Sequence, residues 1–243
     1  MSAPQFDFRG KVVLVTGVGR AGQIGHAVAL AFGRAGAKIV ACDLNAVGVA
    51  ERVREFAAQG VDARPCAGDL TEPDIAALAV EIALRHFARL DVVVNVAGGL
   101  TTYGPIGDMT VDALDREIAI NLKTAVLVSQ AAIEALTQTR GCIVNFSSIA
   151  YFNPQSPMAV YSAAKAAVAG FTRSLAVELQ DRRVRVNAVA PAMVRTGDNV
   201  AAVGDGNVHY VEMQEITDGV MALASSTTTG AIVAISPAPA GPI

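Results

Sequence analysis

The sequence predicts an α/β fold: a doubly wound parallel sheet of about seven strands with helices on both faces. Two observations lead to this fold class. Strand-like and helix-like segments alternate along the whole chain, which is typical of strands joined by helical crossovers. Most strand-like segments are continuously apolar, which indicates burial on both faces of the sheet. With 243 residues, we expect one domain covering residues 1–243.

The elements follow one another regularly. The first strand is expected at 11–16, where β-branched apolar residues precede a glycine-rich turn and a helix that runs to Ala35. Further strands are predicted at 38–42, 62–67, 90–96, 142–147, 185–190 and 231–235, and further helices at 45–59, 72–88, 111–136, 159–178 and near 211–224. Three glycines in the segment about 192–210 predict a mobile loop. The Pro-rich tail 236–243 is not expected to form regular structure.

The composition argues against several kinds of partner. The net charge is −3, so neither nucleic acid nor an anionic membrane is expected to bind. No apolar stretch approaches the roughly 20 residues of a membrane helix, and the N-terminus lacks the pattern of a signal peptide. Cys42, Cys66 and Cys142 are scattered and odd in number, which favours free thiols in the cytoplasm. No His or Cys spacing typical of a metal site occurs, so none is predicted.

The most informative pattern is a tyrosine four positions before a lysine in an Ala-rich, helix-forming segment. Tyr161 and Lys165 therefore share one helical face. A nearby ammonium favours the phenolate and lowers a tyrosine pKa from about 10, so Tyr161 is predicted to exchange a proton near neutral pH. Alone, this spacing is common on surface helices. Its position after a strand ending in Ser148 favours a catalytic site, because ligands of such sheets bind at the C-terminal strand ends.

A second pattern indicates a nucleotide site. The glycine-rich turn at 16–25 follows a strand and opens a helix, so its backbone amides can approach a pyrophosphate. Asp43 ends the second predicted strand, where a carboxylate accepts hydrogen bonds from ribose hydroxyls and repels a 2′-phosphate. This favours NAD over NADP as the cofactor. Arg20 in the turn argues for NADP, because an arginine can hold a phosphate; we give Asp43 more weight.

Together these patterns resemble the short-chain dehydrogenase/reductase family in its single-domain form, over residues from about 10 to 235. The resemblance implies a Rossmann fold with Tyr161 as the general acid/base. It also implies that Ser148 holds the substrate oxygen and that Lys165 lowers the tyrosine pKa and binds the nicotinamide ribose. Asn121 matches the fourth catalytic residue of the family, which anchors a water molecule near the lysine.

The same resemblance assigns the remaining site residues. The cofactor-binding set is Gly17, Gly19, Gly22, Ile24, Gly25, Asp43, Asp69, Leu70, Asn95, Ala97, Gly98, Tyr161, Lys165, Pro191, Val194 and Thr196. Substrate contacts are expected from Leu100, Tyr103, Tyr151, Phe152 and Met193, each equally suited to a core or an interface. The family also implies that the loop at about 192–210 covers the substrate. The glycine loop is two residues longer than the family pattern, so the middle glycine is ambiguous between Gly19 and Gly22. Val96 and Ala192 also depart from that pattern.

We therefore expect an oxidoreductase that transfers a hydride between NAD(H) and a secondary alcohol or ketone, similar to 3-oxoacyl reductases. The alternatives are a non-catalytic NAD-binding regulatory or scaffold protein, an epimerase, or an enoyl reductase of a related branch. A serine hydrolase is excluded, because no Gly-x-Ser-x-Gly surrounds Ser148. The family is commonly tetrameric, and an apolar edge strand needs covering. A homotetramer is expected, with a dimer as the alternative and residues 232–237 buried between subunits.

Overall fold

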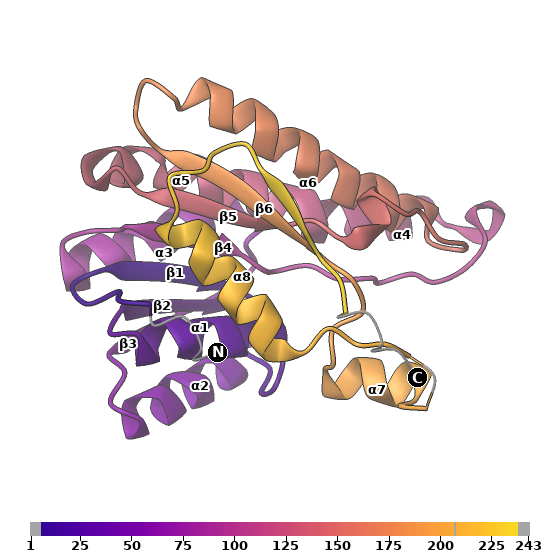
Figure 1. Cartoon of the computed structure of the whole chain (residues 1–243), viewed down its shortest axis with the longest axis horizontal. Coiled ribbons are helices and arrows are strands. Elements are labelled where there is room, and N and C mark those ends of the chain that lie inside the picture. Colours follow the sequence, from indigo (N-terminus) through magenta and orange to yellow (C-terminus); the bar gives the residue numbers. More distant parts are fainter. Residues whose placement is uncertain (1–5, 207, 238–243) are drawn as a thin grey trace, which may run out of the picture.

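A parallel sheet of seven strands in the order β3-β2-β1-β4-β5-β6-β7 forms the centre of the protein (Figure 1). The computed structural model describes residues 6–206 and 208–237. The strands are β1 (Val12–Thr16), β2 (Lys38–Asp43), β3 (Ala63–Ala67), β4 (Val92–Asn95), β5 (Cys142–Phe146), β6 (Arg185–Pro191) and β7 (Ile232–Ile235). The order reverses between β1 and β4, and crevices for ligands form at such points. The predicted fold class is confirmed.

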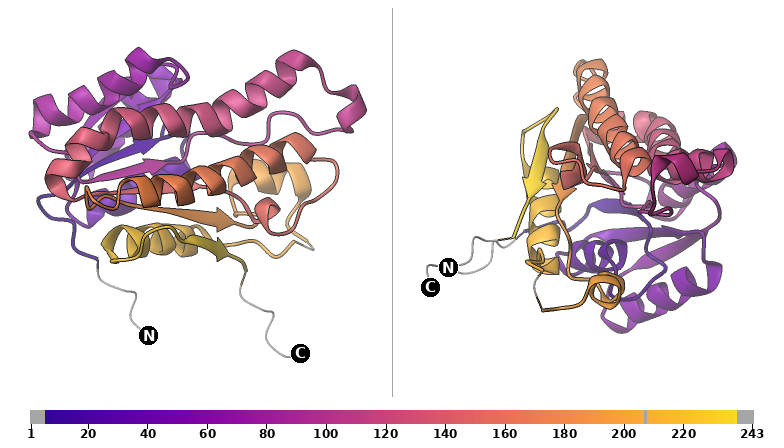
Figure 2. Two further views of the ribbon diagram at one scale, coloured as in Figure 1. Left: turned by 90° about the horizontal axis from the view of Figure 1, so that it is seen from above. Right: turned by 90° about the vertical axis from the view of Figure 1, so that its right-hand side faces the viewer.

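The helices cover both faces of this sheet (Figure 2). They are α1 (Ile24–Arg34), α2 (Ala46–Ala58), α3 (Pro73–Phe87), α4 (Val111–Ile118), α5 (Thr124–Thr139), α6 (Ala159–Glu178), α7 (Gly197–Val203) and α8 (Met213–Ser225), with short turns η1 (Ile106–Asp108), η2 (Ala119–Lys123) and η3 (Ile149–Tyr151). The predicted strands and most of the predicted helices lie close to these positions.

Two hydrophobic cores lie on opposite faces of the sheet. Val13 and Val15 of β1 point to one face, where α1, α2 and α8 pack. Val12 and Leu14 point to the other face, where α3, α5 and α6 pack. Side chains alternate along a strand, so a sheet covered on both sides needs apolar residues at successive positions. This explains the continuous apolar runs in the sequence.

The helix predicted at 111–136 is interrupted. The turn η2 between α4 and α5 is π-helical and contains the buried side chain of Asn121. The whole run Val111–Thr139 is long and apolar enough to cross a membrane by length and composition alone, so the expectation that no stretch approaches that length is wrong. Packing gives it another role: Val128 and Ala132 of α5 are completely buried in the core beside α3 and the sheet.

The segment predicted as a mobile loop contains a helix instead. The hydroxyl of Thr196 accepts a hydrogen bond from the Asn199 amide at 3.2 Å and caps α7. Gly197 is the first residue of α7 and Gly204 follows its last, so neither glycine interrupts its interior. Glycine favours helix ends over helix interiors, which is why counting glycines gave the wrong result. Of the predicted tail 236–243, residues 238–243 lie outside the described residues, as do residues 1–5 of the N-terminus.

Candidate active site

The end of β5 and the middle of α6 are joined by two hydrogen bonds. The Lys165 ammonium donates to the Phe146 carbonyl at 3.0 Å, and the Ser147 hydroxyl donates to the Lys165 carbonyl at 2.8 Å. Lys165 is only 4% exposed, so its ammonium charge depends on the fixed Phe146 carbonyl that accepts its hydrogen bond. The arrangement places the lysine directly beside the strand end that carries Ser148.

Ser148 and Tyr161 form the reactive side of this junction. Ser148 is buried, and its hydroxyl accepts a hydrogen bond from the Ala150 amide at 3.2 Å, which orients it at the start of η3. Lys165 Nζ lies 5.8 Å from the centre of the Tyr161 ring. The structure therefore brings together the serine, tyrosine and lysine predicted from the sequence, in one place at the C-terminal edge of the sheet.

The electrostatics of Tyr161 differ from the sequence prediction. Burial raises the pKa of the Tyr161 phenol; the adjacent Ser148 hydroxyl lowers this pKa, and the negative charge of Glu117 raises it. Burial also lowers the pKa of Lys165 to about 8, against the opposing effect of Glu117. The prediction that Lys165 lowers the tyrosine pKa below its ordinary value is wrong for this structure. Removing a phenolate from water costs more free energy than its hydrogen bonds and nearby charges in the protein supply.

Asn121 is held entirely by the protein. Its Oδ1 accepts from the Gly99 amide at 3.0 Å, and its Nδ2 donates to the Gly99 carbonyl at 2.9 Å. The same Nδ2 lies 3.0 Å from the Glu117 carbonyl and 3.1 Å from Glu117 Oε1. A Cβ atom added to Gly98 would come within 2.7 Å of Asn121 Oδ1, and Gly98 has a φ of +136°. The side chain therefore fixes the segment that leaves β4, and its role toward water stays a prediction.

The glycine loop contains two kinds of glycine. A Cβ on Gly19 would lie 2.6 Å from the Asp43 carboxyl carbon, and a Cβ on Gly25 would lie 2.2 Å from the Gly17 carbonyl oxygen. Gly22 has open space around it but a φ of +71°. The two candidates for the middle glycine therefore differ physically: Gly19 permits a close approach to Asp43, and Gly22 permits a left-handed turn. Which of them contacts the pyrophosphate stays a prediction.

Asp43 holds the loop that it faces. Its Oδ2 accepts from the Gly19 amide at 2.7 Å, and its Oδ1 accepts from the Asn45 amide at 2.9 Å. Arg20, the residue that argued for NADP, forms an ion pair with Asp198 at the start of α7, with an N–O distance of 2.5 Å.

The loop fits a dinucleotide. The Gln23 side chain makes no capping hydrogen bond at the N-terminus of α1, so the first amides of this helix have no side-chain cap. Helix N-termini with uncapped amides favour phosphate. Sequence reasoning missed Thr16, whose Oγ1 accepts from the amides of Val96 and Ala97 at 2.9 and 2.8 Å and ties β1 to β4. Its place at the end of β1, before the first glycine, was the available signal.

The other predicted cofactor residues lie at the same strand ends but differ in what their side chains do. Asp69 Oδ1 accepts from the Thr71 amide at 2.8 Å, next to the buried Leu70. Asn95 is buried and donates to Asn145 Oδ1 at 2.8 Å. Further along, Pro191, Val194 and Thr196 are buried where β6 leads into α7. For Asn95 the described contacts are structural, and its role toward the cofactor stays a prediction.

The five predicted substrate residues all follow strands β4, β5 and β6. Four are exposed, namely Leu100, Tyr103, Phe152 and Met193, and the Tyr151 ring lies 4.8 Å from the Phe152 ring. Parallel strands end on one edge of a sheet, so the topology brings these side chains to the edge that carries Ser148.

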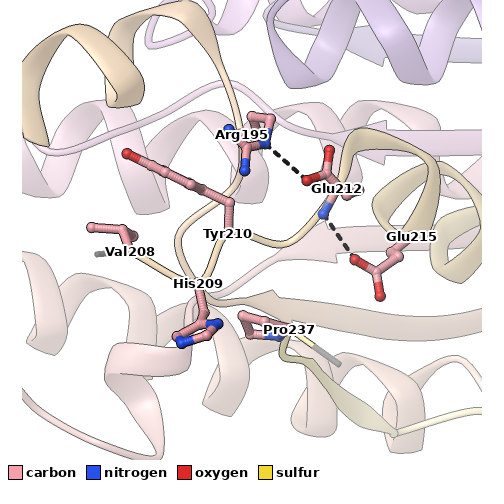
Figure 3. A pocket seen from close by; sticks show the side chains of 7 residues that line it. All are labelled: Arg195, Val208, His209, Tyr210, Glu212, Glu215 and Pro237. Carbon is pink, nitrogen blue, oxygen red and sulfur yellow. Dashed lines mark hydrogen bonds and ion pairs between the residues drawn. The ribbon is translucent and has the colours of Figure 1, made fainter. Parts of the chain in front are cut away.

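A separate cavity of about 380 Å³ lies between α7 and α8 (Figure 3). Arg195 and Tyr210 line it; the guanidinium lies 4.8 Å from the centre of the tyrosine ring and pairs with Glu212 at 2.8 Å. The Tyr210 hydroxyl donates to the Gly204 carbonyl at 2.6 Å. No member of the Ser148–Tyr161–Lys165 group lines this cavity, so it is separate from that group. Across residues 6–206 and 208–237, no group of three or more His, Cys, Asp or Glu side chains is placed to hold a metal ion.

The chain matches the family model described as short chain dehydrogenase over residues 11–205. It is 36% identical over 196 residues to versicolorin reductase stcU of Emericella nidulans, covering 80% of this chain and 73% of that protein. It is 37% identical over 224 residues to the hydroxynaphthalene reductase-like protein Arp2 of Metarhizium robertsii, covering 88% of this chain and 80% of that protein.

Among solved structures, a 7α-hydroxysteroid dehydrogenase in complex with NADH and 7-oxo glycochenodeoxycholic acid superposes with a TM-score of 0.87 at 26% identity. The superposition covers 96% of this chain and 95% of the other. The sequence matches, the fold and the Ser148–Tyr161–Lys165 junction agree with one another: this chain belongs to the short-chain dehydrogenase/reductase family of oxidoreductases.

Proposed function

We propose that this oxidoreductase transfers a hydride between NAD(H) and a secondary alcohol or its ketone. The observation that carries the proposal is the junction of β5 and α6, where the hydroxyls of Ser148 and Tyr161 and the buried ammonium of Lys165 meet at one strand end. Hydroxyl groups at such a position can hold and protonate a carbonyl oxygen on which negative charge develops.

Each residue has a distinct role in the proposed reaction. When bound, the nicotinamide cofactor supplies or accepts the hydride. Ser148 donates a hydrogen bond to the carbonyl oxygen. Tyr161 transfers its phenolic proton to that oxygen in reduction, and takes the proton of the alcohol in oxidation. Because burial raises the pKa of Tyr161, the phenol keeps its proton at neutral pH, and the resting site is ready to act as the acid in ketone reduction.

NAD(H) is the cofactor that we propose, in preference to NADP(H). Support comes from the carboxylate of Asp43 at the end of β2, which faces the glycine loop through its bond to the Gly19 amide. A carboxylate at this position favours ribose hydroxyls over a 2′-phosphate. The ion pair of Arg20 with Asp198 also supports NAD(H), since it holds the cation that argued for NADP.

The proposed substrate is a ring-bearing ketone or the corresponding alcohol. Exposed apolar side chains at the strand ends, including Leu100, Phe152 and Met193, support an apolar ligand. The names of the relatives also support it, because naphthalene and the 7-oxo bile acid are ring systems. A 3-oxoacyl chain is the second substrate class that the proposal includes.

The direct test is NADH oxidation by the purified protein with a panel that contains cyclic ketones, a 7-oxo bile acid and a 3-oxoacyl thioester, each run also with NADPH. We expect turnover with at least one ketone and a preference for NADH. Tight NADH binding without turnover on any member of the panel, in either direction, would instead indicate a non-catalytic NAD-binding module.

We also propose that the chain forms a homotetramer. The support is β7, an apolar strand at the edge of the sheet whose Val233 is exposed. Uncovered apolar edge strands promote association. Light scattering at micromolar concentration should give a mass four times that of the 25.0 kDa chain; a stable monomer would contradict the proposal.

A further inference from the structure

One carboxylate in the site has no assigned role. Glu117 of α4 is 0% exposed, and charged side chains are almost never fully buried unless they are paired. Its Oε2 accepts from the Thr101 amide at 3.0 Å and from the Thr101 hydroxyl. Its Oε1 accepts from Asn121 Nδ2 at 3.1 Å. Glu117 is the acceptor in all three hydrogen bonds, which is the arrangement expected for an ionised carboxylate.

We propose that Glu117 is a positioning residue of this active site, which fixes Asn121 and the segment after β4 and acts as the buried counter-charge of Lys165, thereby setting the pH range in which Tyr161 transfers its proton. The inference rests on the proposed function, since it assigns Glu117 to the same proton transfer. The sequence contains a signal for this pairing: Glu117 stands four positions before Asn121, a spacing that places the two side chains on one helical face.

The positioning half of the argument follows from the hydrogen bonds. Asn121 bonds to both the amide and the carbonyl of Gly99, and Glu117 bonds to Asn121 and Thr101. The chain leaving β4 is therefore held at two points by one network rooted in α4 and η2. Gly98 packs against Asn121 within that network, so a shift of Glu117 would be transmitted to the backbone predicted to border the cofactor.

The electrostatic half follows from burial. Helix α4 packs against α6, and Tyr161 and Lys165 are the titratable groups of α6 that respond to the Glu117 charge. Glu117 raises the pKa of both groups. The remaining charged side chains of α4 and η2 are exposed and screened by solvent; they are Asp112, Asp115, Arg116 and Lys123. Charges inside a protein interact more strongly than at its surface. The Glu117 carboxylate attracts the Lys165 ammonium and repels a Tyr161 phenolate, so it favours the protonated form of both groups.

The test is Glu117→Gln, which keeps the shape and removes the charge. In ketone reduction, the alkaline limb of the kcat/KM profile should move to lower pH by at least about half a unit, or about threefold in rate at a pH on the limb. The direction is the same whether Lys165 or Tyr161 defines the limb, because Glu117 raises the pKa of both. The control Thr101→Val removes one hydrogen bond to Glu117 and keeps its charge, so its limb should not move.

A second readout does not need turnover. The phenolate absorbance of Tyr161, obtained as the difference between each protein and its Tyr161→Phe counterpart, should appear at lower pH in Glu117→Gln than in the wild type. Glu117→Asp keeps the charge on a side chain that is one methylene group shorter, and it should give a smaller shift in the same direction. This variant decides the question if Glu117→Gln does not fold. Coincident limbs and coincident phenolate titrations would overturn the inference. A wild type without turnover would overturn the proposed function, and the titration would still decide the role of Glu117.

Discussion

The nucleotide side and the substrate side of this molecule are held together differently. On the nucleotide side, the side chains of Thr16 and Asp43 accept hydrogen bonds from backbone amides, above a core that contains the fully buried Phe32 and Phe56. On the substrate side, α7 has no buried residue. It is held mainly at its ends, by the Thr196 cap, by the Tyr210 hydroxyl, which donates to the Gly204 carbonyl, and by the exposed ion pair between Arg20 and Asp198.

The difference indicates which parts of the site are fixed in advance. Hydrogen bonds shielded from solvent are costly to leave unmade, and three of the four bonds that Thr16 and Asp43 accept are partly buried, which favours one geometry for the glycine loop and the exit of β4. Exposed ion pairs contribute little and weaken with salt, so α7 can be displaced at low cost. Elements of low local stability are the ones that ligand-binding sites use for opening and closing. The glycine loop is therefore the more firmly held of the two regions, and α7, in the predicted substrate region, is the less firmly held.

The largest effect is expected at the junction between the two sides. Tyr161→Phe removes the acid but leaves the ring, so turnover should fall about 10³-fold while NADH binding changes little. Steady-state kinetics and NADH fluorescence titration measure the two quantities. Tyr151→Phe is the matched control, since it removes a hydroxyl from the same strand end and should lose far less. A Tyr161→Phe enzyme with near wild-type turnover would disprove the assignment.

Asp43→Asn tests the fixed side. Removing the charge should raise the ratio of kcat/KM for NADPH over NADH by about tenfold or more, a change of about 1.4 kcal/mol. The amide keeps one acceptor and loses the other, so unfolding stability should fall by about 1 kcal/mol. Asp69→Asn on the adjacent strand end is the control for the ratio. If the wild type already prefers NADPH, the interpretation of Asp43 is wrong and Arg20 decides the cofactor.

Lys165→Met tests the cost of the buried ammonium. The folded pKa of Lys165 is about 8, below the ordinary value, so the unfolded chain binds more protons between pH 8 and the ordinary lysine pKa of about 10.4. Wild-type stability should therefore rise with pH in this window. Below the window, the free-energy cost of burying the Lys165 ammonium is present in full. Relative to Lys165→Met, the wild type should gain about 2 kcal/mol between pH 8 and 9.5 in denaturant unfolding. Parallel pH profiles of the two proteins would show that Lys165 is not desolvated.

The smallest effect is expected on the substrate side. In a double-mutant cycle with Arg20→Gln and Asp198→Asn, the coupling in unfolding free energy should be about 0.5 kcal/mol and vanish in high salt. The KM for the ketone should respond more than kcat, because the pair joins α7 to the glycine loop and makes no contact with the reacting hydroxyls. A coupling above about 2 kcal/mol would show that α7 is as firmly held as the nucleotide side.

The sequence was most predictive where chemistry depends on local pattern. Strand positions followed from apolar runs, and the pairing of Tyr161 with Lys165 followed from helical spacing. It failed at α7, where the positions of the glycines at the helix ends mattered more than their number. It also failed for the pKa of Tyr161, because the degree of burial is set by the packing of α6 on β5 and is absent from the spacing of residues.

By itself, the sequence determined the parallel sheet, the glycine loop at its edge, and the family to which the chain belongs, because periodicity and motif spacing are local properties. The tertiary structure alone decided which glycine approaches Asp43, that Arg20 pairs with Asp198, and that Glu117 is completely buried. These contacts join segments whose separation in the sequence carries no signal, or depend on how deeply a side chain is desolvated. The contacts between distant segments and the degree of desolvation follow only from the packing of helices on the two faces of the sheet.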